Sequence, residues 1–286
     1  MSESQRLLGT ANHDRDAAGL TYVYPVISRR AGGVSIGINL NPNNACNWHC
    51  AYCQVPELKR GVSPDIDIPL LESELRDFLH VVMEGSFMRQ RVPEDCRRLC
   101  DIAISGNGEP TSSGQFGEIV TAIGNVMRNF ELSGRIPLVL ISNGSYAHRP
   151  QVKSGLAAIA ELGGEAWMKV DSATEEGIKH INGVALSPAR LFDQVKTCAE
   201  ICPTWIQTCV MTWDGEPPTE AEQHAYVAFL SELVADGAPL KGVRLYGLAR
   251  PSLQPEAMHV AQLDEPWMRG FAARIETTGL SVLLTP

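Results

Sequence analysis

Short apolar runs alternate along the chain with longer segments whose apolar residues recur at helical spacing. Seven short runs rich in aliphatic and β-branched residues predict strands, at residues 34–40, 101–105, 138–142, 166–171, 205–213, 242–248 and 281–284. Six longer segments predict helices, at residues 69–83, 115–130, 149–162, 188–201, 219–235 and 265–277. Strand–helix alternation is typical of βαβ units, so we expect a parallel sheet.

This alternation predicts an α/β fold, a partial parallel (β/α)6 barrel of the TIM type. An open doubly wound sheet is the alternative. The core is expected at about residues 34–250, inside a single domain of residues 1–286. The remaining residues are expected to form short N- and C-terminal extensions.

Composition narrows the class of protein. Hydrophobic residues make up 44% of the 286 residues and charged residues 20%, which excludes a disordered, collagen-like or coiled-coil chain. No run of 18 apolar residues is present, so no membrane-spanning helix is expected. The N-terminus is polar and has no apolar stretch typical of a secretory signal. We therefore expect a cytoplasmic protein.

The charge balance disfavours nucleic-acid binding. The chain has 24 Lys and Arg against 33 Asp and Glu, a formal net charge of -9, and no basic run. Proteins that bind nucleic-acid phosphates usually carry a basic surface. A role in tRNA modification is therefore disfavoured on electrostatic grounds.

Polar residues and glycines follow the predicted strands where these end. In parallel α/β sheets, ligands bind beyond the C-terminal ends of the strands. The segments at this edge are a cysteine-rich loop at 46–53, Gly106–Thr111, Ser142–Gly144, Lys169–Ser172 and Gly247–Arg250. The sequence therefore predicts a ligand site at this edge.

Three cysteines carry the most specific chemistry. Cys46, Cys50 and Cys53 have the spacing C-x3-C-x2-C, which lets three thiolates on one loop converge on a metal centre. A zinc site completed by His49 or by a distant cysteine is one alternative, and three unligated buried cysteines are another. Three thiolates on a four-iron cluster would leave one iron open for a further ligand.

The cysteine motif, with Tyr52 at its aromatic position and a strand of a predicted barrel before it, resembles the signature of the radical SAM superfamily. The resemblance implies that Cys46, Cys50 and Cys53 hold a [4Fe–4S] cluster whose fourth iron binds S-adenosylmethionine (SAM). It further implies an oxidoreductase-type iron–sulfur enzyme, in which reductive cleavage of SAM gives a 5′-deoxyadenosyl radical that abstracts hydrogen from a substrate. The protein supplies orientation and electrostatics for chemistry that its cofactors carry.

The segment Gly106-Asn107-Gly108-Glu109 is similar to the Gly-Gly-Glu element with which this superfamily binds the amino group of SAM. Gly108 and Glu109 match, whereas Asn107 stands where the first glycine usually is. A tight strand-to-helix turn is the structural alternative.

Further contacts are expected from the next strands. Ser142 and Asn143 match a position where the superfamily often contacts its cofactor, although they also suit a turn with Gly144. The resemblance implies ribose or carboxylate contacts for Lys169 and Asp171, for which a structural ion pair is the alternative. Arg250 either binds a substrate anion or closes the barrel.

A narrower resemblance extends over residues 25–251. The segment 25–39, the Gly-Glu-Pro-Thr element and Ala249-Arg250-Pro251 are similar to those of wyosine-synthase-like iron–sulfur oxidoreductases. Wyosine synthases carry a second cluster with cysteines upstream of the main motif, and no cysteine precedes Cys46 here. The other five cysteines, Cys96, Cys100, Cys198, Cys202 and Cys209, are interpreted as free thiols.

Four functions remain open on the sequence alone. The first is hydrogen abstraction from an unidentified substrate, with an electron donor such as flavodoxin or ferredoxin as partner. The second is wyosine-like modification of a tRNA base. The third is activation of a partner protein by placing a glycyl radical on it. The fourth is a non-catalytic metal-binding protein.

Overall fold

The computed structural model describes residues 7–9, 18–28 and 32–286. The predictions for the first six residues and for Arg29 and Arg30 lie outside these residues. No helix in the described ranges is long and apolar enough to cross a lipid bilayer.

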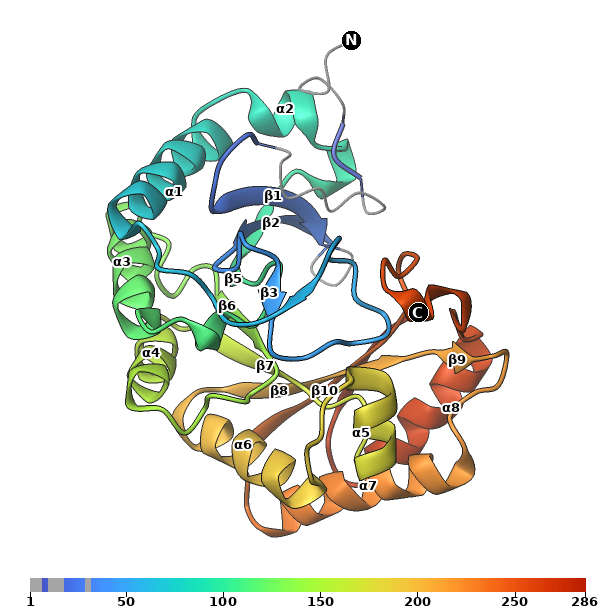
Figure 1. The fold of residues 1–286 in the computed structure, drawn as a ribbon. Coiled ribbons are helices and arrows are strands. Elements are labelled where there is room, and N and C mark those ends of the chain that lie inside the picture. Colours follow the sequence, from blue (N-terminus) through green and yellow to red (C-terminus); the bar gives the residue numbers. More distant parts are fainter. Residues whose placement is uncertain (1–6, 10–17, 29–31) are drawn as a thin grey trace.

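An eight-stranded, curved sheet forms the centre of the molecule (Figure 1). Its spatial order is β1, β2, β5, β6, β7, β8, β10, β12. The bounds are β1 Val23–Ser28, β2 Gly33–Ile38, β5 Leu99–Ile104, β6 Leu138–Ser142, β7 Glu165–Lys169, β8 Thr204–Val210, β10 Leu240–Gly247 and β12 Val282–Thr285. All neighbouring strands are parallel except β1, which pairs antiparallel with β2. Since β1 and β12 are the two edges of the sheet, the barrel is partial.

Six helices cover the outer face of the sheet (Figure 1). They are α1 Ile68–Met83, α3 Phe116–Asn129, α4 Pro150–Glu161, α6 Pro188–Ile201, α7 Glu220–Ala235 and α8 Glu265–Glu276. Their apolar stripes are buried against the strands, as in α3, where Phe116, Ile119 and Ile123 have no exposed surface. The predicted (β/α)6 half-barrel is confirmed, with the predicted strands and helices ending within a few residues of their observed bounds.

The structure also contains elements that the sequence did not predict. The strand β1 lies in the expected N-terminal extension and carries Pro25, which a strand tolerates at a sheet edge. A Cβ atom at Gly37 would lie 2.2 Å from the ring of Tyr24, so this glycine makes room for β1 on β2. The other unpredicted elements are α2 Phe87–Arg91, α5 Glu175–Asn182, β3 Ala45–Cys46, β4 Lys59–Arg60, β9 Thr212–Trp213, β11 Val260–Ala261 and three short 3-10 turns.

The helix α5 departs from the alternating pattern, because it follows β7 directly and precedes α6. The Thr174 side chain accepts a hydrogen bond from the Gly177 amide and begins the helix. Gly183 ends it with a left-handed backbone, φ 61°. Its last turn contacts the cysteine loop, so α5 is part of the site.

Candidate active site

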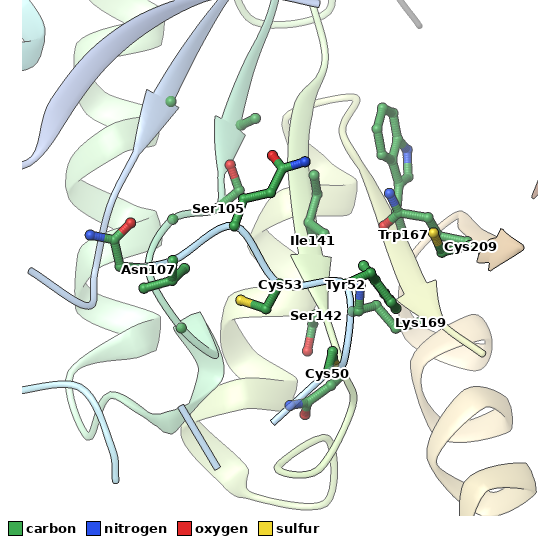
Figure 2. Close-up of a pocket in the computed structure, with 18 of the residues that line it drawn as sticks. Cys50, Tyr52, Cys53, Ser105, Asn107, Ile141, Ser142, Trp167, Lys169 and Cys209 are labelled. Atoms are coloured by element: carbon green, nitrogen blue, oxygen red, sulfur yellow. The ribbon is translucent and has the colours of Figure 1, made fainter. Parts of the chain in front are cut away.

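A cavity of about 300 Å³ opens at the C-terminal ends of the strands (Figure 2). It brings together most of the residues predicted from the sequence: Cys46, Cys50, Tyr52, Cys53, Gly108, Glu109, Ser142, Asn143, Lys169 and Arg250. Asp171 does not line the cavity and lies behind it. A cavity of this size is at the lower end of the range for small-molecule sites.

The cysteine loop is held by α5 on one side. His49 N donates to Asn182 O at 3.0 Å, and Ala51 N donates to Ile181 O at 2.8 Å. A Cβ atom at Gly183 would lie 2.6 Å from His49 O, so a side chain there would push the loop away. The last turn of α5 therefore fixes the backbone that carries Cys50.

Two further contacts hold the same loop. Trp48 is 2% exposed and donates from Nε1 to Ser145 Oγ at 3.0 Å. The Ser252 hydroxyl donates to Ala51 O at 2.7 Å. Because these partners lie far apart in the sequence, the three thiols are positioned by the tertiary fold.

Burial opposes the ionisation of two of the thiols, Cys46 and Cys50. Burial raises the pKa of Cys46 to about 11 and that of Cys50 to about 12. The Trp48 amide donates to Cys46 Sγ at 3.4 Å, while Lys169 and the Asn182 amide group favour the Cys50 thiolate. A bound metal centre would displace these thiol protons, since thiolates are the ligands.

The donor set fits an iron–sulfur cluster. No three His, Cys, Asp or Glu side chains in the described ranges are arranged around one point as a single metal ion requires. A four-iron cluster distributes its thiolates over different irons, and three thiols on one loop facing one cavity suit that requirement. Cys46, Cys50 and Cys53 are the residues that would hold it.

Glu109 is buried and tightly held. Its Oε1 accepts hydrogen bonds from Thr111 N at 3.0 Å, from Thr111 Oγ1 at 2.5 Å and from Ser142 Oγ at 2.7 Å. Its Oε2 accepts one, from Asn143 N at 2.7 Å. Burial raises the pKa of Glu109, although these hydrogen bonds lower it in part. Oε2 therefore has the acceptor capacity left for a cationic ligand group.

Three predicted residues, Ser142, Asn143 and Gly108, contact Glu109 or the cysteine loop. The Ser142 hydroxyl donates to Glu109, and Asn143 Nδ2 donates to Asn47 Oδ1 at 2.9 Å, which joins the end of β6 to the cysteine loop. A Cβ atom at Gly108 would lie 2.0 Å from Ala45 O. Gly108 is therefore required by the close approach of two protein segments.

Lys169 and Asp171 have different surroundings. Lys169 Nζ lies 4.8 Å from the Tyr52 ring centroid. Burial opposes its charged form, but Tyr246 and Asp171 raise the pKa of Lys169 above its ordinary value. Asp171 accepts hydrogen bonds from Tyr52 OH at 2.5 Å, Asn182 Nδ2 at 2.7 Å and Cys209 N at 2.9 Å. Asp171 thus supports the cavity wall from behind.

Sequence reasoning did not predict several of the lining residues, Gln54 and Gln207 among them. Gln54 Oε1 accepts a hydrogen bond from Arg250 Nη1 at 2.9 Å. This bond links the segment that follows β10 to the end of the cysteine loop. Gln207, on β8, is 2% exposed, and its Oε1 has no hydrogen-bond partner within the described residues. Gln207 is a polar residue within a largely apolar strand, and this pattern could have identified it in the sequence. Cys209 is two residues further along this strand and also lines the cavity.

Comparison with known sequences does not assign the chain to a family. No family model matches the chain. A curated protein named GTPase Obg, from Brachyspira hyodysenteriae, is 26% identical over 138 residues, 48% of this chain, and the match spans 17% of that protein's length. The present chain has no G-x-x-x-x-G-K-[S/T] segment, the usual phosphate loop of GTPases.

Solved structures give the fold. A radical SAM methyltransferase from Sphaerobacter thermophilus matches with a TM-score of 0.60 at 11% identity, over 92% of this chain and 68% of that one. A mutant of spore photoproduct lyase matches with a TM-score of 0.52 at 10% identity, over 84% and 73%. Archaeal TYW1 reaches 0.47 at 14% identity, over 88% and 74%, which does not bear on the narrower resemblance. The chain therefore has the fold of radical SAM enzymes, as its cysteine motif predicts.

Proposed function

We propose that the chain is a radical SAM enzyme that abstracts hydrogen from a substrate. The observation that carries the proposal is that all three cysteines of the C-x3-C-x2-C loop share one cavity with Glu109, at the C-terminal end of a (β/α)6 half-barrel. Ligand sites of parallel barrels lie at this end. When bound, the cluster and SAM supply one-electron cleavage of a sulfonium, which generates a hydrogen-abstracting radical.

Each residue of the cavity has a role in this proposal. Cys46, Cys50 and Cys53 would hold the cluster, and its remaining iron would be available to SAM. Glu109, whose Oε2 accepts a single hydrogen bond from the protein, would bind the amino group of SAM. Lys169, kept cationic by its surroundings, offsets the negative charge that three thiolates and a ligand carboxylate bring.

Two buried aromatic side chains also shield part of the loop from water. Trp48 and Tyr52 are 2% and 9% exposed, and both line the cavity beside the thiols. Shielding from water would protect a reactive radical from side reactions with solvent. It would also strengthen the electrostatic contacts of Glu109. Arg250 also lines the cavity, and we assign it to the binding of the substrate.

The proposal is tested by iron content and SAM cleavage of the anaerobically reconstituted protein. We expect about four irons per chain and formation of 5′-deoxyadenosine under reducing conditions. Cys50→Ala should abolish both. Cys202→Ala, at a buried thiol away from the cavity, is the matched control and should retain both. One zinc per chain, or SAM cleavage by Cys50→Ala at the wild-type rate, contradicts the proposal.

A further inference from the structure

The segment that follows β10 is hydrogen-bonded to the end of the cysteine loop, and we call residues 250–254 the strap. Its donors reach three backbone carbonyl groups, those of Ala51, Cys53 and Val55. Cys53, the last cysteine of the motif, is the central residue of this set. The strap therefore contacts the loop at the backbone of one of the three proposed metal ligands.

Gln254 provides two of these hydrogen bonds. It is 6% exposed, and its Nε2 donates to Cys53 O at 3.1 Å and to Val55 O at 2.8 Å. A side-chain amide has two N–H groups, so both are used on these carbonyls. Gln254 is also the N-cap of the 3-10 turn Pro255–Met258, but its side chain makes no capping hydrogen bond to that turn. The amide group therefore holds the cysteine loop and not the turn that it precedes.

Two further donors come from the residues just before Gln254. The Ser252 hydroxyl donates to Ala51 O at 2.7 Å and accepts a hydrogen bond from Gln254 N at 3.0 Å. Leu253 N donates to Cys53 O at 2.9 Å. Ser252 is 6% exposed and Leu253 58%, so Leu253 contributes through its backbone. The Cys53 carbonyl is therefore held by both a backbone amide and a side-chain amide of the strap.

The strap is anchored at both of its ends. β10 precedes it in the central sheet, and β11 follows it and pairs antiparallel with β9. Next to this pairing, His259 Nδ1 lies 2.6 Å from Asp214 Oδ1. Because the anchors already order the chain on both sides, little further conformational entropy is lost when the strap holds the loop.

The strap and α5 hold different parts of the cysteine loop. α5 accepts hydrogen bonds from the amides of His49 and Ala51, and its Asn182 contacts Cys50 Sγ at 3.4 Å. The strap instead donates to the carbonyl of Cys53. Cys50 and Cys53 are therefore fixed by two separate elements, one before and one after the fifth barrel strand, β8.

We propose that Ser252 and Gln254 are positioning residues for Cys53, an inference that rests on the proposed function of the three cysteines. Both residues lie outside the lining of the cavity and act through the loop backbone. Holding this backbone restricts the directions that the Cys53 thiol can take before a cluster binds, which lowers the entropic cost of binding. The strap also carries Arg250, so one element positions a proposed cluster ligand and a residue assigned to the substrate.

The test begins with the metal-free protein and follows each cysteine separately. Gln254→Met removes both N–H donors and keeps a side chain of similar size. Alkylation by iodoacetamide is measured at Cys50 and at Cys53 by tandem mass spectrometry. We expect Cys53 to react about fivefold faster or more than in the wild type, because two hydrogen bonds no longer oppose opening of the loop there. The rate at Cys50 should be unchanged, since α5 still holds it.

The matched control is Gln223→Met on α7. Gln223 is 7% exposed and also makes two side-chain hydrogen bonds, from Nε2 to Pro218 O and from Arg274 Nη1 to Oε1. A merely structural loss of hydrogen bonds lowers stability without selecting one cysteine, so this control should leave both alkylation rates at their wild-type values. Ser252→Ala is the second variant, used if Gln254→Met does not fold, and it should also accelerate alkylation of Cys53.

The reconstituted protein gives a second readout, the rate at which iron is released to a chelator. Release should be about tenfold faster in Gln254→Met than in the wild type or in Gln223→Met. Equal alkylation of Cys53 in the wild type and the strap variants overturns the inference. So does an equal acceleration at Cys50 and Cys53, or by both glutamine variants. Failure of the proposed function is distinguishable, because the wild type then assembles no iron–sulfur cluster, whereas alkylation of the metal-free protein still tests the strap.

Discussion

At the scale of single residues, the hydrogen bonds of Glu109 support its proposed role in binding the amino group of SAM. Both of its carboxylate oxygens accept hydrogen bonds from the protein, with donors supplied by Thr111, Ser142 and Asn143. Burial raises its pKa, and these donors limit the rise. The donors therefore favour the charged form of a buried carboxylate, which is the form that binds an ammonium group.

The first prediction concerns Ser142→Ala. Losing one donor raises the pKa of Glu109 further, so the carboxylate protonates at a higher pH in the variant. SAM affinity, measured by calorimetry, should therefore decline as the pH falls in both proteins. In the variant this decline should begin at a higher pH than in the wild type. The free energy of unfolding should drop by about 1–3 kcal/mol, since a hydrogen bond to a charged group is lost. Ser231→Ala, exposed on α7, is the control, and superimposable pH profiles would contradict the prediction.

The second prediction concerns Gln207, whose Oε1 has no partner in the described part of the chain. Gln207→Met removes a buried unpaired acceptor, so the melting temperature should be unchanged or higher. The free energy of unfolding should rise by no more than about 1–3 kcal/mol. Gln223 is similarly buried but hydrogen-bonded through both side-chain atoms, to Pro218 O and Arg274. Gln223→Met should therefore destabilise. Equal destabilisation by both changes would show that Gln207 has a structural partner.

At the scale of elements, the last turn of α5 determines the position of the cysteine loop. Gly183 has φ 61° and a Cβ atom there would meet His49 O. Asn182 contacts both Cys50 Sγ, at 3.4 Å, and Asp171. The helix therefore couples the backbone of the cysteine loop to the end of β7.

The third prediction uses this coupling. Gly183→Ala should lower the unfolding free energy in urea and the iron content after reconstitution, because it combines left-handed strain with a collision against the loop. Gly237→Ala is matched, since Gly237 has φ 79° with no atom within 4 Å of an added Cβ. It should lose only about 1–2 kcal/mol from strain and keep its iron. Equal iron content in the two variants would contradict the role of α5 in positioning the cysteine loop.

The N-terminal ends of β7, β8 and β10 are joined by a different cluster. Glu165 accepts hydrogen bonds from Trp167 Nε1 at 2.8 Å, Trp205 Nε1 at 3.1 Å and Lys241 Nζ at 2.6 Å. Arg244 forms an ion pair with the same carboxylate at 3.3 Å. Burial acts to raise the pKa of Glu165, but the hydrogen bonds from Lys241 and Trp167 outweigh it and lower the pKa below its ordinary value.

The fourth prediction follows from this direction. A carboxyl group whose pKa is lower in the folded than in the unfolded state stabilises the fold above its unfolded pKa. That contribution is lost as pH falls through the folded pKa. Wild type should therefore exceed Glu165→Gln by about 1–3 kcal/mol in urea unfolding at neutral pH, and the gap should close below about pH 4. A gap that stays constant with pH would contradict it.

At the scale of the whole molecule, sequence patterns predicted the barrel because each parallel strand and its covering helix repeat one pattern of apolar positions. β1 was missed, since Pro25 interrupts a short antiparallel edge strand. α5 was missed, since it is eight residues long and has Gly177 in its interior. The cysteine spacing and the family resemblance together predicted a site containing the three cysteines and Glu109, and these four residues line one cavity. Contacts such as Trp48–Ser145 join residues 97 positions apart, which local patterns do not encode.

The central claim is that Cys46, Cys50 and Cys53 hold a four-iron cluster with one open iron. The most direct measurement is low-temperature EPR of the anaerobically reconstituted, dithionite-reduced protein, recorded with and without SAM. We predict a [4Fe–4S]+ signal that changes when SAM is added, because SAM binds the open iron. A protein that holds one zinc and gives no signal, or a cluster signal that SAM leaves unchanged, would contradict the claim.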